Sequence, residues 1–92
     1  MKLVINKCYG GFSFSDFAVK KLNLDYASQY IERDDPALIA LIEKYGSKKC
    51  SSEWSNLEIV EIPDEITDYR ITAYDGYEDV IYVQNGLIWD AV

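Results

Sequence analysis

Residues 69–89 read YRITAYDGYEDVIYVQNGLIW, and this stretch decides the fold class of the chain. Apolar and polar side chains alternate along residues 69–74, which is the period of a β-strand. Asp75-Gly76 and Asn85-Gly86 are dipeptides that favour two-residue hairpin turns, and an apolar run lies beside each of them. The stretch therefore predicts three successive antiparallel strands. A short helix over residues 77–84 is the alternative.

Three further extended segments precede this stretch. Residues 2–6 form a short, apolar and β-branched run, which is typical of a buried strand. Residues 29–33 are a second extended segment. Residues 57–62 alternate and stop at Pro63, which cannot continue a central strand.

Two helices are expected between these segments. Ser13 and Asp16 have the spacing of a capping box, which predicts a helix over residues 13–22. Asp35 and Pro36 are typical of an N-cap and a first helical position, and Gly46 is typical of a helix end. Residues 47–56 read as a polar loop. The sequence thus predicts one α+β domain over residues 1–92, with two helices packed on one face of a mostly antiparallel sheet.

Charge and cysteine content exclude several classes of function. The first 50 residues carry a net charge of +2, whereas residues 51–92 carry −9, so duplex nucleic acid is not an expected partner. The chain has no histidine, and Cys8 and Cys50 lie far apart, so we expect no metal site, no cofactor and no enzymatic activity. The sequence shows neither a membrane-spanning run nor a signal peptide, which predicts a soluble, cytoplasmic protein.

The segment NKCYGGFSFS, residues 6–15, is the candidate ligand site. It joins a strand end to a helix start, where free backbone N–H groups favour an anion. Neither GxxxxGK[ST] nor GxGxxG is present, so no nucleotide fingerprint applies. A tight turn that needs glycine at positive φ is the structural alternative. The predicted ligand-binding residues are Lys7, Tyr9, Gly10, Gly11, Phe12, Ser13, Ser15 and Arg33.

Eight tyrosines are more than a core of this size needs, which predicts aromatic side chains at an interface. Cross-strand pairs on the exposed face of the sheet are the alternative. We expect a homo-oligomer whose interface contains Tyr74, Tyr77, Tyr82 and Trp89.

Four motifs together resemble a group of small bacteriophage and prophage proteins. They are NKCYGGF at residues 6–12, ERDDPAL at 32–38, VEIPD at 60–64 and YDG at 74–76. The resemblance implies an accessory protein that acts in the cytoplasm of a bacterial host cell and counters host defence. One class of such proteins oligomerises and sequesters nucleotide immune signals without catalysis.

Two hypotheses of function follow. In the first, the protein sequesters a small phosphate-containing ligand, such as a cyclic nucleotide: Lys7 and Arg33 pair with phosphate, and Tyr9 or Phe12 stacks on a base. In the alternative, the acidic C-terminal half inhibits a host defence protein by direct contact. That contact uses Tyr74, Tyr77 and Trp89 as anchors and Asp75, Glu78 and Asp79 for steering. A structural role in the virion is a third possibility.

Overall fold

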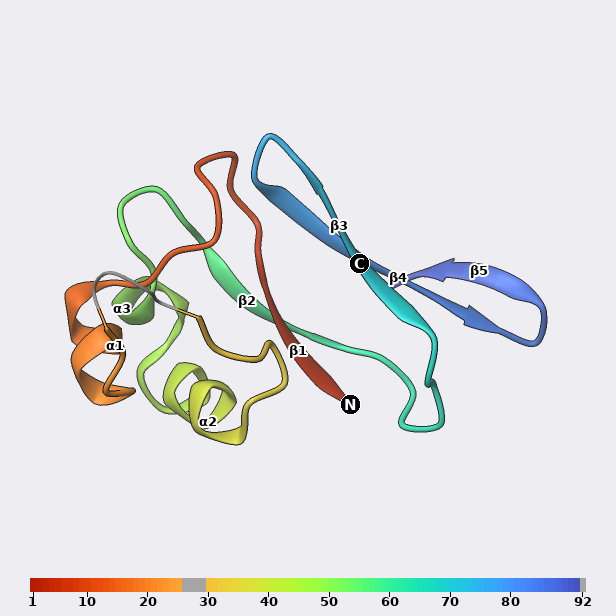
Figure 1. The fold of residues 1–92 in the computed structure, drawn as a ribbon, viewed down its shortest axis with the longest axis horizontal. Helices are drawn as coiled ribbons and strands as arrows, with labels where there is room; N and C mark the ends of the chain where they lie inside the picture. The colour runs from red at the N-terminus through yellow and green to blue at the C-terminus, as the bar shows by residue number, and fades with distance from the viewer. Residues whose placement is uncertain (26–29, 92) are drawn as a thin grey trace.

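The computed structural model describes residues 1–25 and 30–91 and has an α+β fold, as the sequence predicts (Figure 1). Its strands form two antiparallel sheets, one of two strands in the order β1-β2 and one of three strands in the order β3-β4-β5. The elements are β1 Lys2–Asn6, α1 Asp16–Lys21, α2 Pro36–Tyr45, α3 Ser47–Cys50, β2 Leu57–Glu61, β3 Tyr69–Tyr74, β4 Tyr77–Gln84 and β5 Leu87–Asp90.

The sequence predicts a single sheet, and the structure corrects this prediction to two sheets. Strands β1 and β4 lie side by side, but no ladder of backbone hydrogen bonds joins them. The N–H of Val4 donates to the carbonyl of Arg33 over 2.8 Å. The N–H of Asn6 donates to the Glu78 carboxylate, also over 2.8 Å. A loop carbonyl and a side chain thus occupy the edge of β1 that faces β4, and the sheets stay separate.

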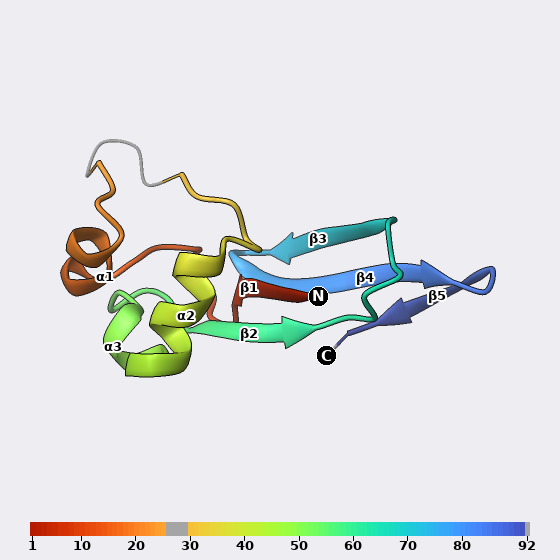
Figure 2. The same ribbon diagram turned by 90° about the horizontal axis from the view of Figure 1, so that it is seen from below.

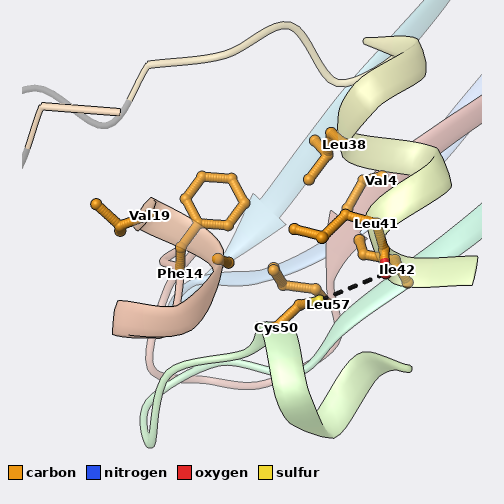
Figure 3. Packing of buried hydrophobic residues seen from close by; sticks show 9 residues of the cluster. Val4, Phe14, Val19, Leu38, Leu41, Ile42, Cys50 and Leu57 are labelled. Atoms are coloured by element: carbon orange, nitrogen blue, oxygen red, sulfur yellow. Dashed lines mark hydrogen bonds between the residues drawn. The ribbon is translucent and has the colours of Figure 1, made fainter. Parts of the chain in front are cut away.

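The core has two parts, which meet on the two faces of β1. Val4 points into a cluster with Leu57 and the buried side chains of the three helices (Figure 3). Leu3 and Ile5 point the other way, into a cluster that includes Val80 of β4. Successive side chains of a strand alternate between its faces, so burial on both faces explains the uninterrupted apolar run of β1.

The helices gather at one end of the molecule, and the β4–β5 hairpin projects at the other (Figure 2). The start of α2 is confirmed: the carboxylate of Asp35 accepts hydrogen bonds from the N–H groups of Ala37 and Leu38. Gly46 ends α2, also as expected. The packing of helices on one face of a sheet stays a prediction.

Three sequence predictions in the helical part are corrected by the structure. The N-cap of α1 is Ser15 rather than Ser13, because the Ser15 hydroxyl accepts from the N–H of Ala18 at 3.1 Å. The short helix α3 begins the segment that was expected to be a loop. Residues 30–33 form no strand, and position 29 lies outside the described residues.

Both hairpin predictions are confirmed, and the helical alternative for residues 77–84 is wrong. Asp75 and Gly76 have φ of 51° and 86°, and Asn85 and Gly86 have 55° and 76°. Positive φ at both central residues is the geometry that joins two twisted antiparallel strands with a two-residue turn.

Candidate functional site

The Gly10-Gly11 loop is packed on both sides by backbone. A Cβ built on Gly10 would lie 1.9 Å from the carbonyl oxygen of Trp54, and a Cβ built on Gly76 would lie 2.6 Å from the nitrogen of Gly11. Gly11 also has a φ of 100°, which side chains other than hydrogen rarely permit. The glycines are therefore needed for close packing and conformation, whether or not the loop also binds a ligand.

Arg33 is held by a carboxylate rather than left open for a phosphate. Its guanidinium makes two hydrogen bonds to Glu78, of 2.7 and 2.9 Å, and a third to the carbonyl of Val4. The ring of Phe12 lies 3.6 Å below the guanidinium carbon. The side chains of Arg33 and Glu78 are 26% and 9% exposed, so this bidentate ion pair is largely buried.

Lys7 is engaged in the same way by the neighbouring residue of β4. Its ammonium lies 2.8 Å from the Asp79 carboxylate, and the Lys7 side chain is 8% exposed. The ammonium also lies 5.3 Å from the ring centre of Tyr77, which in turn packs on the ring of Tyr9 at 5.2 Å. The charge of Lys7 is thus neutralised within the chain.

Asn6 completes this arrangement, which we call the joint: Asn6, Lys7, Arg33, Glu78 and Asp79. The fully buried Asn6 amide donates to the carbonyls of Cys8 and Gly76, each over 2.7 Å, and its oxygen accepts from the N–H of Asn56. The joint therefore connects the end of β1 with the start of β4 and with the loop before β2.

The two serines predicted to bind a ligand also have partners within the chain. The hydroxyls of Ser13 and Ser52 lie 2.5 Å apart. Ser15 caps α1 and donates to the carbonyl of Lys49. The structure thus gives a structural role to all eight predicted site residues except Tyr9, whose contact is the Tyr77 ring. Their binding of a ligand stays a prediction.

Sequence reasoning missed Glu78 and Asp79 as the partners of the two cations. A signal was available for Glu78, because it is in phase with Val80 and Tyr82 along an alternating strand. A carboxylate at an inward-facing position needs a buried partner, and residues 1–50 hold most of the cations.

The four predicted interface residues lie on opposite faces of the three-stranded sheet. Tyr74 and Tyr77 are cross-strand partners on one face, which we call the outer face, and Tyr74 is 75% exposed. Tyr82 and Trp89 are cross-strand partners on the inner face, where Tyr82 packs against the second core cluster. Trp89 donates through its indole nitrogen to the carbonyl of Gln84. The four residues therefore do not form one patch.

The outer face carries further exposed apolar side chains. A hollow of about 160 Å³ lies at its far end, lined among others by Arg70, Ile81, Val83 and Ile88. Ile88 is 74% exposed and Leu87, on the opposite face of the same strand, 60%. The projecting hairpin thus exposes apolar surface on both faces.

The remaining chemistry is sparse. Cys50 is fully buried, its thiol points at the carbonyl of Leu41 (Figure 3), and burial raises the pKa of that thiol. Cys8 is partly exposed. Within residues 1–25 and 30–91, no cluster of three or more Asp, Glu, Cys or His side chains offers a metal site. No helix of that part of the chain has the length and apolar character needed to cross a membrane.

Three comparisons, with protein-family models, with curated proteins and with solved structures, find no match to this chain. The resemblance to small phage proteins therefore stays a prediction.

Proposed function

We propose that this chain is a non-catalytic binding protein that contacts a partner protein through the outer face of its three-stranded sheet. The observation that carries this proposal is the set of exposed apolar side chains around the hollow on that face. From β3 to β5 the outer face consists of Arg70, Thr72, Tyr74, Tyr77, Asp79, Ile81, Val83, Ile88 and Asp90.

The charge of this region indicates a basic partner surface. Residues 51–92 carry a net charge of −9, and they include every strand of the three-stranded sheet. Asp68 borders the hollow and Asp75 lies exposed at the β3–β4 turn. Such carboxylates raise the rate of encounter with a basic surface. Glu78 and Asp79 do not serve as free steering groups, because they neutralise Arg33 and Lys7.

The same ion pairs make phosphate binding at the Gly10-Gly11 loop the less favoured function. A phosphate would have to displace the Glu78 carboxylate from Arg33 or the Asp79 carboxylate from Lys7. Displacement of Glu78 would leave a carboxylate that is 9% exposed without its partner cation, which is costly, and a phosphate on Lys7 would have to compete with the Asp79 carboxylate. Contact through the outer face requires no such rearrangement.

Affinity capture from bacterial lysate tests the proposal with matched variants. The full chain is the bait. It is compared with an outer-face variant that combines Tyr74→Ser with Val83→Ser, and with Glu58→Ser at an exposed position of β2. We expect a basic host protein that the wild type and Glu58→Ser capture, and that the outer-face variant loses. Titration of that protein in purified form should show at least about tenfold weaker binding to the outer-face variant.

Two results would overturn the proposal. One is that every captured protein binds the outer-face variant as well as it binds the wild type. The other is a native mass spectrum of the protein from phage-exposed cells that carries a few hundred daltons of bound nucleotide, which would support the phosphate hypothesis instead.

A further inference from the structure

Strand β5 is an edge strand of the three-stranded sheet. It is the last strand of the order β3-β4-β5, so within the described residues no strand pairs with its second edge. The N–H of Ala91 donates to the carbonyl of Val80 at 2.9 Å, and Leu87 faces Gln84 across the two-residue turn. Odd-numbered residues therefore bond toward β4, and the N–H and C=O of Ile88 point away from it. These groups can pair with another strand.

The side chains of β5 lack the usual protection of such an edge. Proteins commonly shield edge strands by keeping them very short or with a charged side chain, proline or a bulge, and β5 is short but carries neither lysine nor proline. Here the sequence of β5 is LIWD, with three large apolar residues before one acid. The hairpin projects from the body of the molecule in both views (Figures 1 and 2).

We propose that a second copy of this chain pairs with β5 in antiparallel orientation, about a twofold axis through Ile88. The two three-stranded sheets then form one six-stranded sheet. Ile88 lies opposite Ile88 of the second copy and exchanges two backbone hydrogen bonds with it. Leu87 lies opposite Trp89 of the second copy, and this pair occurs twice. The inference goes beyond the proposed function and does not rest on it.

The register follows from side-chain matching. With the axis at Ile88, every directly opposed pair among Leu87, Ile88 and Trp89 is apolar. An axis one residue toward the C-terminus places Ile88 opposite Asp90, and an axis one residue toward the turn places Trp89 opposite Asn85. Because directly opposed apolar side chains stabilise a strand pair, the register with the axis at Ile88 is the favoured one.

The area available fits a reversible dimer. An aromatic side chain buries roughly 150–250 Å², and an aliphatic one buries less. The exposed parts of Val83, Leu87, Ile88 and Trp89 therefore amount to on the order of 400 Å² per copy. With the strand backbone, the total approaches the roughly 1,200 Å² at which specific interfaces begin. We expect a dimer whose population depends strongly on protein concentration.

Sedimentation velocity of the full chain over a range of concentrations measures this dimer. Ile88→Lys should raise the dissociation constant by more than about tenfold, because it opposes two like charges at the axis. The matched control is Thr72→Lys, which is on the same face of the sheet but on β3, and it should leave the constant unchanged. Ile88→Pro removes the outward N–H while sparing the pairing with β4, and it should also give a monomer.

Cross-linking identifies the register. In a Cys8→Ser background, Ile88→Cys should form a disulfide-linked dimer under mild oxidation, because directly opposed residues have Cα atoms about 5.5 Å apart. Thr72→Cys should not form one. Circular dichroism of each variant establishes that it is folded.

The salt dependence of the dissociation constant distinguishes this dimer from a head-to-tail association. Two acidic sheets repel each other, so added salt should strengthen the edge-paired dimer. A head-to-tail contact between the lysine-bearing helices of one copy and the acidic sheet of another would weaken with salt. A monomer at every concentration, a dimer that Ile88→Lys leaves intact, or a dimer that dissociates with salt would each overturn the proposal.

Discussion

The joint and the outer face differ in what their sequences predict and in what the structure leaves exposed. The joint contains the residues that most resemble a binding site in sequence, and the fold uses nearly all of them internally. The outer face contains residues that read as ordinary hairpin strands, and it leaves large apolar side chains exposed. A cation beside a glycine loop thus indicates a site only when no buried carboxylate elsewhere in the chain pairs with it.

The largest expected effect is at the buried ion pair. Glu78→Ala removes the partner of Arg33 and leaves a largely buried guanidinium, so the free energy of unfolding should fall by about 3–5 kcal/mol. Urea denaturation followed by circular dichroism measures it. Glu58→Ala, on the exposed side of β2, is the matched control and should change stability by less than about 0.5 kcal/mol. Equal effects at the two positions would show that the joint does not stabilise the fold.

The next largest effect is expected at the two glycines of the Gly10-Gly11 loop. Gly10→Ala places a methyl group against the Trp54 carbonyl, and the backbone must move, which costs about 3 kcal/mol. Gly11→Ala meets open space and has only an unfavourable φ to accommodate, at about 1–2 kcal/mol. Thermal unfolding should rank Gly10→Ala as the less stable variant. The reverse order would place the packing constraint of the loop elsewhere.

The rates at which a thiol reagent labels Cys8 and Cys50 test how far each side chain is buried in the first half of the chain. The thiolate is the reactive form, and burial raises the pKa of Cys50, so Cys50 should stay unlabelled at pH 8 while the protein is folded. Cys8, which is partly exposed, should react first. Mass spectrometry should find one label on the folded protein and two labels after unfolding in urea. Rapid double labelling of the folded protein would contradict the burial of Cys50.

The smallest stability effect is expected on the outer face. Tyr74→Ser and Val83→Ser remove exposed side chains, so each should change the free energy of unfolding by less than about 0.5 kcal/mol. Urea denaturation beside the Glu78→Ala variant gives the contrast directly. A loss of more than 2 kcal/mol would mean that these side chains stabilise the fold and are not held available for a partner.

Local signals made much of the fold predictable. Asp35-Pro36 acts through a helix cap to adjacent residues, and Asp75-Gly76 and Asn85-Gly86 act through their own positive φ; the structure confirms all three. The division into two sheets was not predictable in this way, because it depends on Arg33 and Glu78 meeting at the edge of β1 from distant parts of the chain. The internal ion pairs of the candidate site could not be predicted for the same reason. The partners of Lys7 and Arg33 lie in β4, far along the sequence.

The buried contact between Asn6 and Glu78 also bears on how the chain folds. Its two residues are separated by 72 positions, so β1 acquires its full set of hydrogen bonds only after β4 has been synthesised. Until then a nascent chain holds Arg33 without its counter-ion, and Leu3 and Ile5 lack their contact with Val80. Long-range closure of this kind slows folding and couples the two ends of the chain. The packing around β1 is therefore expected to be completed only after β4 has left the ribosome.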